Sequence, residues 1–441
     1  MRDYLTILGA GLAGSEAAWQ AAERGVSVVL YEMRPVKPTP AHKTDHCAEL
    51  VCSNSLGNNQ SPSAPYLLKE ELRKFNSLVI DAGDTHAVPA GAALAVDREL
   101  FSKKITEQLL KHPNITLIRE EVTEIPSEGP VIVATGPLTS PRLSESISRL
   151  IGQEYLYFYD AISPIVDANT INYDKTFFAS RYDKGTDDYL NCPLNEGQYY
   201  SLVNELKKSE KVPFKSFEKP IYFEGCMPVE ELAMRGDKTL AFGPLKPVGL
   251  LHPETKEQFY AVVQLRHENK EGTAFNLVGF QTKLTYPEQK RVIRLIPGLE
   301  NAEFFRFGAI HRNTYINAPD VLSCELDLKK NSGIYFAGQI IGVEGYVESV
   351  SMGLLAALSA VKRIKGEVYS TPPVDTALGS LLKYVTETRR QSFQPMNINY
   401  GLFQVHEMKI RNKRERNKKI ELKALDSLSQ WMETINGELI K

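Results

Sequence analysis

The sequence predicts an α/β fold, in which helices cover a mostly parallel sheet and a smaller α+β domain is inserted into the chain. Three features support this prediction. Near the N-terminus, an apolar strand at residues 5–8 leads through a glycine-rich turn into an alanine-rich helix, and a second strand follows at 26–31. Later segments at 131–136 and 333–338 are again apolar strands that end in glycine. Strands that alternate with helices in this way form the parallel sheet of βαβ units.

The turn after the first strand has the pattern of a dinucleotide-binding site. Its residues are Gly9, Ala10, Gly11, Leu12, Ala13 and Gly14. In this pattern Gly9 permits the tight turn, Gly11 lets a pyrophosphate approach the backbone, and Gly14 lets the helix pack closely on the strand. Glu32 follows the second strand, where a carboxylate accepts the ribose hydroxyls of an adenosine. The register of strand, helix, strand and acid favours this site over a simple glycine-rich turn.

Composition excludes several classes of protein. At 441 residues the chain can bury more than one core, and 42% hydrophobic with 24% charged residues is typical of a soluble globular protein. A net charge of −2 gives no overall attraction for nucleic acid, so an RNA partner needs a local basic surface. No apolar run has the length of a membrane span, and the first strand begins too early for a leader peptide. We therefore expect a cytoplasmic protein that does not bind membranes.

The cysteines point to the same compartment. The five are Cys47, Cys52, Cys192, Cys226 and Cys324, and they form neither a CxxC pair nor a metal-ligand spacing. An odd number of such cysteines favours free thiols in a reducing environment. We therefore expect no disulfide framework and no metal site.

The chain divides into two expected domains. Residues 1–151 and 299–441 form the first, because strands of the parallel sheet occur on both sides of a middle region with a different pattern. Residues 152–298 form the insertion, in which short apolar strands such as 261–265 and 275–280 mix with helices.

The remaining elements of the first domain follow from local patterns. Residues 35–65 are rich in proline and too long for a simple connection, so we expect a functional loop there. A helix at 97–111 leads to a strand at 115–118. In a helix at 346–365, apolar residues recur at helical spacing, which predicts one buried face.

Two further segments indicate the cofactor. The first consists of Ala134, Thr135 and Gly136, and the second contains Gly338, Gln339, Gly345 and Tyr346. A nicotinamide dehydrogenase needs only the N-terminal glycine pattern, whereas these segments resemble the middle and C-terminal flavin-contacting motifs of the glutathione-reductase family. There the start of the late helix faces the isoalloxazine, and its dipole stabilises negative charge on the reduced ring. The resemblance implies a glutathione-reductase-like FAD-binding Rossmann domain.

Eight stretches together resemble the bacterial folate- and FAD-dependent tRNA uracil-5-methyltransferases of the MnmG/TrmFO family. They lie at residues 9–19, 46–55, 223–228, 242–249, 278–282, 308–314, 338–346 and 393–399. The stretches that contain cysteine are far more specific than the glycine pattern. The match extends to about residue 405, although Gln404 stands where the family has proline.

This resemblance implies a defined activity. The family methylates C5 of the T-loop uridine of tRNA, U54, with 5,10-methylenetetrahydrofolate as carbon donor and FADH2, formed with NAD(P)H, as reductant. It implies tRNA as the partner, no DNA, and a monomer or weak homodimer. Two rival enzymes remain: one that methylates a ribosomal RNA uridine, against which Cys52 argues, and an MnmG-like wobble-uridine modifier, against which Cys226 and His311 argue. A non-enzymatic alternative is a flavoprotein that binds RNA or a partner and only senses redox state. Such a protein would need no reactive thiol.

Methylation of uracil at C5 requires a thiol. C5 is a poor nucleophile until a thiolate adds to C6 and turns the C4 carbonyl into an enolate, and a base must later remove the C5 proton. The resemblance makes Cys226 and Cys52 the catalytic candidates. Either can attack C6; we favour Cys226, with Cys52 as the second thiol and base. Cys47, Cys192 and Cys324 are more typical of small buried residues.

Other polar residues are candidates for binding. His311, Arg312 and Asn313 lie in a family motif and are expected near flavin or folate, and the ring of Tyr346 can stack on either.

A basic run at 409–423 is expected to be helical, so that only a subset of its cations can contact tRNA phosphates. Its central cations are Arg411, Lys413, Arg414, Arg416, Lys418 and Lys419. If the run is only a solvated face, the RNA surface is expected on the insertion, around Arg235, Lys238 and Lys246.

Overall fold

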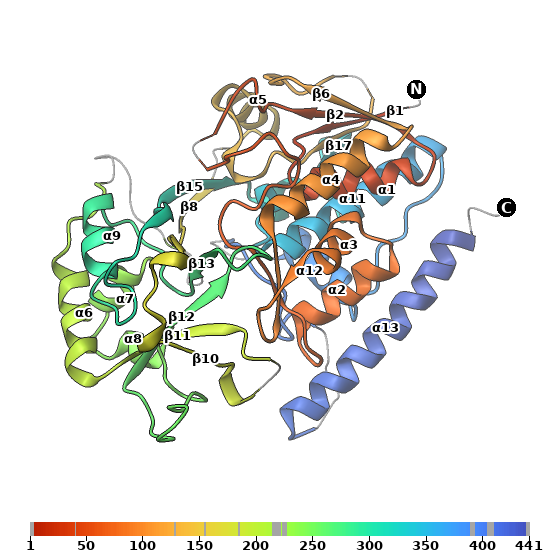
Figure 1. Cartoon of the computed structure of the whole chain (residues 1–441). Helices are drawn as coiled ribbons and strands as arrows, with labels where there is room; N and C mark the ends of the chain where they lie inside the picture. Colours follow the sequence, from red (N-terminus) through yellow and green to blue (C-terminus); the bar gives the residue numbers. More distant parts are fainter. Residues whose placement is uncertain are drawn as a thin grey trace.

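The computed structural model describes residues 4–39, 41–127, 129–153, 156–183, 186–213, 222, 227–388, 393–403 and 410–437. A sheet covered by helices forms one part, and a smaller unit from the middle of the sequence, coloured yellow to green, lies beside it (Figure 1). The predicted α/β class, with its inserted α+β unit, is confirmed.

The main sheet is parallel apart from one edge strand. Its members are β1 Tyr4–Leu8, β2 Ser27–Glu32, β6 Ile115–Arg119, β7 Val131–Val133, β16 Asp327–Leu328 and β17 Asn331–Phe336. They are arranged in the order β16-β17-β7-β1-β2-β6. The apolar strand β1 lies inside the sheet and pairs in parallel with β2 and with β7, as predicted. At one edge, β16 runs antiparallel to β17.

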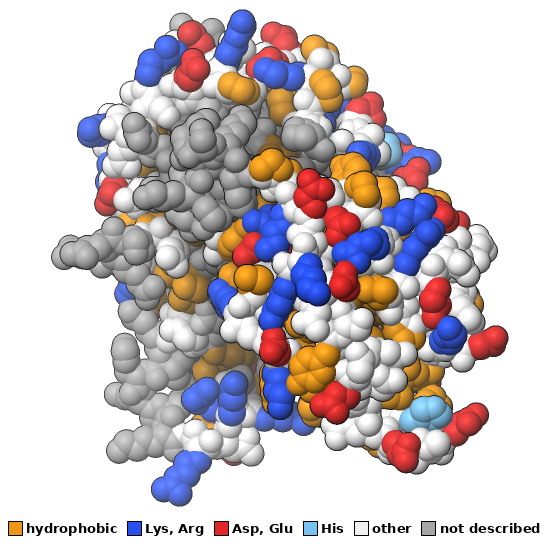
Figure 2. Space-filling view, turned by 90° about the vertical axis from the view of Figure 1, so that its left-hand side faces the viewer, with side chains coloured by type: hydrophobic (Ala, Val, Ile, Leu, Met, Phe, Trp, Pro, Cys, Tyr) orange, Lys and Arg blue, Asp and Glu red, His pale blue; other side chains and the backbone are white. Residues whose placement is uncertain are grey.

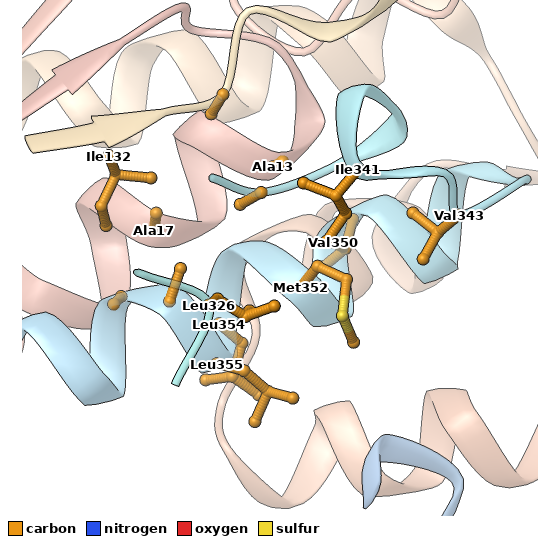
Figure 3. Packing of buried hydrophobic residues seen from close by; sticks show 14 of the residues in the cluster. Ala13, Ala17, Ile132, Leu326, Ile341, Val343, Val350, Met352, Leu354 and Leu355 are labelled. Atoms are coloured by element: carbon orange, nitrogen blue, oxygen red, sulfur yellow. The ribbon is translucent and has the colours of Figure 1, made fainter. Parts of the chain in front are cut away.

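Two helices pack together against this sheet. They are α1 (Leu12–Ala22) and α11 (Tyr346–Lys365), and the bounds of α11 match the prediction. Their approach is close because a Cβ atom on Gly353 of α11 would lie only 2.2 Å from the carbonyl oxygen of Ala13 in α1. Figure 3 shows the buried side chains around this contact, including Ala13 and Val350. The alanine-rich sequence of α1 therefore serves close packing.

The remaining elements of this part surround the sheet. The helices are α2 Ala64–Lys74, α3 Leu78–Thr85, α4 Arg98–Lys111, α5 Pro141–Ile151, α10 Ala318–Val321, α12 Ala377–Glu387 and α13 Lys413–Gly437, and the short strands β3 Ser55–Asn58, β4 Ala87–Val88 and β5 Ala93–Val96 form a separate sheet. The long helix α13 lies along the outside of α2 (Figure 1). It buries Ile420, Ala424, Leu428, Trp431 and Ile435, which recur at helical spacing.

The inserted unit has its own antiparallel sheet. The strands are β9 Ile165–Asp167, β10 Phe177–Phe178, β11 Tyr189–Leu194, β12 Ala261–His267, β13 Ala274–Leu277 and β14 Phe304–Arg306, in the order β10-β11-β12-β13-β9-β14. Its helices are α6 Glu196–Lys208, α7 Val229–Met234, α8 Thr239–Phe242 and α9 Tyr286–Ile293. A two-stranded ribbon of β8 Leu156–Ala161 and β15 Ile310–Tyr315 connects it to the main sheet.

Two separate hydrophobic cores underlie the two parts. The first core draws on residues 5–151 and 315–435, and the second on residues 166–302. The second sheet also includes β14, which follows residue 298, so the exact domain bounds stay a prediction. The strand predicted at 275–280 is shorter than expected, because Gly279 adopts a φ of 73° and turns the chain after Leu277.

The buried carboxyl group of Glu71 generates a prediction about pH. It accepts hydrogen bonds from the backbone N–H groups of Ala377 (2.7 Å) and Leu378 (2.8 Å) at the start of α12. Burial raises the pKa of Glu71 from 4.5 to about 8 despite these hydrogen bonds. Between those pH values the folded protein keeps a proton that the unfolded chain has released, so Glu71 makes the free energy of unfolding fall as pH rises.

Glu71→Gln should remove this contribution, so that the free energy of unfolding falls by up to about 1.4 kcal/mol less per pH unit than in the wild type. Denaturant titrations across this pH window measure the slope. Glu107→Gln, at an exposed position of α4, is the matched control and should keep the wild-type slope. Equal slopes in the Glu71 variant and the wild type would contradict the assignment.

Candidate functional site

Three segments that are distant in the sequence meet at the start of α1. A Cβ atom on Gly9 would lie 2.8 Å from the Ala134 carbonyl oxygen, and one on Gly338 would lie 2.8 Å from the Ala13 Cβ. Gly9 also has a φ of 95°, which other residues rarely adopt. The turn after β1, the end of β7 and the segment after β17 are therefore in direct contact.

The turn after β1 fits a pyrophosphate. On Gly11 a Cβ atom would meet nothing within 4 Å, so the backbone there borders open space. On Gly14 a Cβ atom would lie 1.8 Å from the Gly9 carbonyl oxygen, so this glycine allows the helix to pack on the turn. Gly11 is the N-cap of α1 and makes no side-chain cap hydrogen bond, which leaves the helix N–H groups available to an anion.

Glu32 both holds this turn and borders the same cavity. Its Oε2 accepts a hydrogen bond from the Ala10 N–H at 3.0 Å, and its Oε1 accepts from the Arg34 N–H at 3.1 Å and from Arg34 Nε at 2.9 Å. Burial favours the neutral acid, but the charge and hydrogen bonds of Arg34 outweigh it and hold the pKa of Glu32 below its usual value. A carboxylate has about four acceptor positions, so Glu32 has room for one ribose hydroxyl.

The middle segment forms the opposite wall. Ala134 is buried, and Thr135 lines the same cavity as Gly11 and Glu32. Gly136 begins a short 3-10 helix, η1 (Gly136–Leu138). Of the predicted dinucleotide residues, Gly9, Gly11, Glu32 and Thr135 thus line one cavity.

A second cavity, of about 370 Å³, is lined by the predicted residues of the late glycine segment except Gly338, together with one of the two predicted thiols. Cys52, Gln339, Gly345 and Tyr346 all line it, with Asp160 beside them. Gly345 is the N-cap of α11 and has no side chain to cap the helix, and the acidic residue Glu348 lies in the first turn. The positive end of the α11 dipole is therefore directed at the cavity, as expected for a site that stabilises negative charge.

Tyr346 holds the loop that carries Cys52. Its hydroxyl oxygen accepts hydrogen bonds from the backbone N–H groups of Cys52 (2.8 Å) and Ser53 (3.2 Å). Sequence reasoning assigned Tyr346 only a stacking role. Residues 294 positions apart are thus joined directly at the cavity wall.

Three arginines that the sequence analysis did not identify fix the same loop. Arg98 donates to the carbonyl oxygens of Leu50 (2.6 Å) and Cys52 (2.9 Å), and Arg306 donates to that of Val51 (2.7 Å). Arg266 in β12 donates to the Ser53 hydroxyl at 2.8 Å and to the Asn54 side-chain oxygen at 3.0 Å. Arg98 is in turn paired with Glu268. Arginines from both parts of the molecule therefore position the thiol.

The surroundings of Cys52 keep its thiol protonated. Burial raises the pKa of Cys52, and the Asp160 carboxylate raises it further, against the opposing charge of Arg98. Attack on C6 by this sulfur requires its proton to leave first, whereas a protonated thiol is ready to exchange a proton with a substrate.

Two further buried ionisable groups lie at the wall of this cavity. Lys69 donates to the carbonyl oxygens of Leu56 (3.0 Å), Asn58 (2.8 Å) and Pro65 (2.9 Å), and burial lowers its pKa to about 8. Glu348 lines the cavity and accepts from the Ile398 N–H at 3.0 Å, and burial raises its pKa to about 7. Lys69 therefore braces the cavity wall with all three of its N–H donors.

The other predicted residues have different positions. Cys226 lies outside the described residues, as do the side chains of His311 and Arg312. The backbone of His311 pairs with that of Asp160, which places β15 next to the second cavity.

The remaining cysteines differ from one another. Cys47 and Cys192 are buried, as expected, but Cys324 is exposed, because it lies in the turn between α10 and β16. Within the described ranges no cluster of histidine, cysteine and acidic side chains could hold a metal ion. No helix among the described residues is long and apolar enough to cross a membrane.

Surface charge differs between the two candidate RNA surfaces. On α13, Lys418 is paired with Glu421 and Lys419 with Glu415. Arg411 and Arg414 are exposed and have no salt bridge within the described part of the chain. On the face of the inserted unit, Lys and Arg side chains alternate with Asp and Glu (Figure 2).

Comparison with known proteins gives consistent matches over the whole chain. A family model described as glucose inhibited division protein A matches residues 4–368. The methylenetetrahydrofolate–tRNA-(uracil-5-)-methyltransferase TrmFO of Natranaerobius thermophilus is 57% identical over 429 residues, which cover 97% of this chain and 99% of that protein. The protein of the same name from Bacillus subtilis is 53% identical over 431 residues, covering 98% and 99%.

Solved structures show a similar fold. The GidA protein of Aquifex aeolicus superposes with a TM-score of 0.71 and 18% sequence identity, over 98% of this chain and 73% of that one. At this identity the likeness concerns the fold alone.

The two glycines of the turn provide a matched pair of variants. Gly14→Ala should lower the free energy of unfolding by roughly 1–3 kcal/mol, because its Cβ atom forces α1 away from the turn. Gly11→Val should lower the stability of the flavin-free protein by only about 0.5–1 kcal/mol, the loss of a favourable N-cap residue, but should abolish FAD retention by filling the pyrophosphate space. Denaturant unfolding and flavin absorbance per chain measure the two effects. A Gly11→Val protein that keeps a full complement of FAD would disprove this placement.

Proposed function

Since the chain belongs to the glucose-inhibited division protein A family, and within it to the methylenetetrahydrofolate–tRNA-(uracil-5-)-methyltransferases, we propose that it methylates C5 of a uridine in tRNA. The observation that carries this proposal is identity of 57% over 97% of the chain. The carbon comes from 5,10-methylenetetrahydrofolate, and the target is U54 of the T-loop. The enzyme acts in the cytoplasm as a monomer or weak homodimer.

FAD is the cofactor of the reaction, and its reduced form, replenished by NAD(P)H, supplies the electrons that convert a methylene group into a methyl group. The residues around the first cavity fit its dinucleotide part: Gly11 leaves room for the pyrophosphate, and Glu32 retains an acceptor for a ribose hydroxyl. The second cavity fits the ring, because the start of α11 directs its dipole there. Gly345 and Gln339 line this part.

The two thiols divide the work on uracil. Cys226 adds to C6, and Cys52 removes the proton from C5 after the carbon unit has been transferred. The position of Cys52 in the second cavity supports its contact with the reacting base, and because burial raises its pKa, Cys52 must first give up its own proton before it can accept the one from C5. Tyr346, Arg98 and Arg306 act as positioning residues, because they hold the backbone around Cys52.

Nucleoside mass spectrometry tests the function and both thiols together. In cells that lack the protein, tRNA should contain no 5-methyluridine at the T-loop position, and the wild-type gene should restore it. Cys226→Ala and Cys52→Ala should each reduce the methylation rate at least about 100-fold, because each removes a reacting group, while flavin content stays normal. Cys324→Ala, which removes an exposed thiol, is the control and should restore full methylation.

Two outcomes would contradict the proposal. Persistence of 5-methyluridine in tRNA without the protein would refute the activity, and loss of a 5-methyluridine from ribosomal RNA instead would transfer it to that substrate. With 5-fluorouracil in the target RNA, C5 cannot lose a proton and the C6–sulfur bond should persist. Mapping the adduct to Cys52 would reverse the roles of the two thiols, and an adduct on neither cysteine would eliminate the covalent mechanism.

The exposed start of α13 is the proposed tRNA contact. Arg411 and Arg414 are exposed without salt-bridge partners among the described residues. With a net charge of −2, such local cations must supply the release of counterions from RNA.

Charge reversal of Arg411 and Arg414 to Glu should weaken tRNA binding about tenfold at low salt and lower the slope of log affinity against log salt by about one to two. Filter binding at several salt concentrations measures both quantities. Reversal of Lys103 and Lys111 on α4 changes the net charge equally and should have little effect. If both double variants bind tRNA equally well, the tRNA surface would instead be expected on the inserted unit, around Arg235, Lys238 and Lys246.

A further inference from the structure

A third cavity, of about 810 Å³, adjoins the one that contains Cys52, because Pro65 lines both. It lies between the start of α2, residues 398–403 and the first turns of α13. Its apolar lining consists of Pro62, Pro65, Ile398, Phe403 and Ile420. No residue assigned above to catalysis lies in it.

Two polar side-chain atoms in this cavity have no hydrogen-bond partner among the described residues. The side chain of Asn417 is only 8% exposed, and its Oδ1 is buried without a hydrogen-bond partner among the described residues. The hydroxyl oxygen of Tyr400 is also buried and has no hydrogen-bond partner among the described residues. Both residues line the cavity. Buried polar groups are almost always hydrogen-bonded in proteins, so this pair indicates a ligand with donor and acceptor groups of its own.

The cavity also carries positive charge. Lys413 and Arg416 of α13 line it, and neither has a salt bridge within the described ranges. The nearby acid Glu421 is neutralised by Lys418 at 2.6 Å and accepts from the Ser61 hydroxyl at 3.0 Å. The two lining cations are therefore available to an anionic group.

We propose that this cavity binds the p-aminobenzoyl-glutamate tail of the reduced folate, an inference that rests on the proposed function. The tail carries an aromatic ring, then an amide, then carboxylates. The apolar lining accommodates the ring, the Asn417 side chain pairs with the amide, and Lys413 and Arg416 bind the carboxylates. Because Pro65 lines both cavities, the pterin end of the same molecule would lie toward the cavity that contains Cys52.

The combination of groups selects this ligand over RNA. The tail offers an aromatic ring, an amide and carboxylates in the order in which the cavity offers an apolar lining, Asn417 and two cations, whereas RNA would engage the cations through phosphate, and the titrations below distinguish the two ligands. Additional glutamates add carboxylates, so the affinity for the folate should rise with the number of glutamates in its tail.

Calorimetric titration of the FAD-loaded protein, under anaerobic conditions, tests this directly with tetrahydrofolate that carries either one or four glutamates. In the wild type the tetraglutamate should bind about tenfold more tightly, the size of effect expected for one or two charge-assisted contacts. In the Lys413→Gln, Arg416→Gln double variant this ratio should fall to about one or two. Lys423→Gln, at an exposed position of the same helix that does not line the cavity, is the control and should keep the wild-type ratio.

Asn417→Leu provides a second readout. It should weaken both ligands by a similar factor of about ten, because the amide is common to them, while flavin content and thermal unfolding stay normal. A double variant that keeps the tenfold ratio, or a wild type whose affinity does not depend on tail length, would overturn the inference. So would a double variant that loses tRNA affinity with an unchanged ratio, which would make the cavity a site for RNA phosphate.

The outcomes separate this inference from the proposed function. A wild type that binds tetrahydrofolate monoglutamate with no effect of tail length contradicts the tail site alone. A wild type that binds neither folate contradicts the proposed function as well.

Discussion

The site depends on the close backbone approach of three chain segments at the start of α1. Side chains are absent where these segments touch: a Cβ atom would lie 1.8 Å from a backbone oxygen at Gly14 and 2.2 Å from one at Gly353. Such distances leave no alternative to glycine unless the helices move apart. This contact places the pyrophosphate turn and the end of β7 at the first cavity and the start of α11 at the second. The same close packing of backbone therefore fixes both the fold and the positions of the predicted cofactor residues.

The inserted unit completes the site rather than forming a separate module. Arg306 in β14 and Arg98 in α4 hold the backbone carbonyls around Cys52, and Arg266 in β12 holds the side chains of Ser53 and Asn54. Removing Arg98 or Arg306 would leave carbonyl oxygens of this loop without donors, which is costly. Cys52 is therefore positioned jointly by side chains from both parts of the molecule, although it belongs to the first part of the chain.

Local patterns predicted much of the fold and part of the site. The glycine turn, the strand pairing of β1 with β7 and the bounds of α11 follow from apolar periodicity and from glycines at chain reversals. Tyr346 and Cys52 were both expected near the cofactor, but the hydrogen bond between them was not, since they lie 294 residues apart. Cys324 was predicted to be buried but is exposed. The residues next to it in the sequence do not reveal that this segment forms a surface turn.

The sequence by itself determined the α/β class and the dinucleotide turn, because short-range spacing encodes these features, whereas the chemistry expected of its thiols came from the family resemblance. Only the tertiary structure decided that Arg98, Arg266 and Arg306 serve the loop of Cys52, and that Asn417 and Arg416 border a cavity next to it. An arginine in a strand or helix looks the same in sequence whether it is solvated or buried. Its partners are chosen by long-range packing, which brings backbone carbonyls from another segment to its guanidinium group.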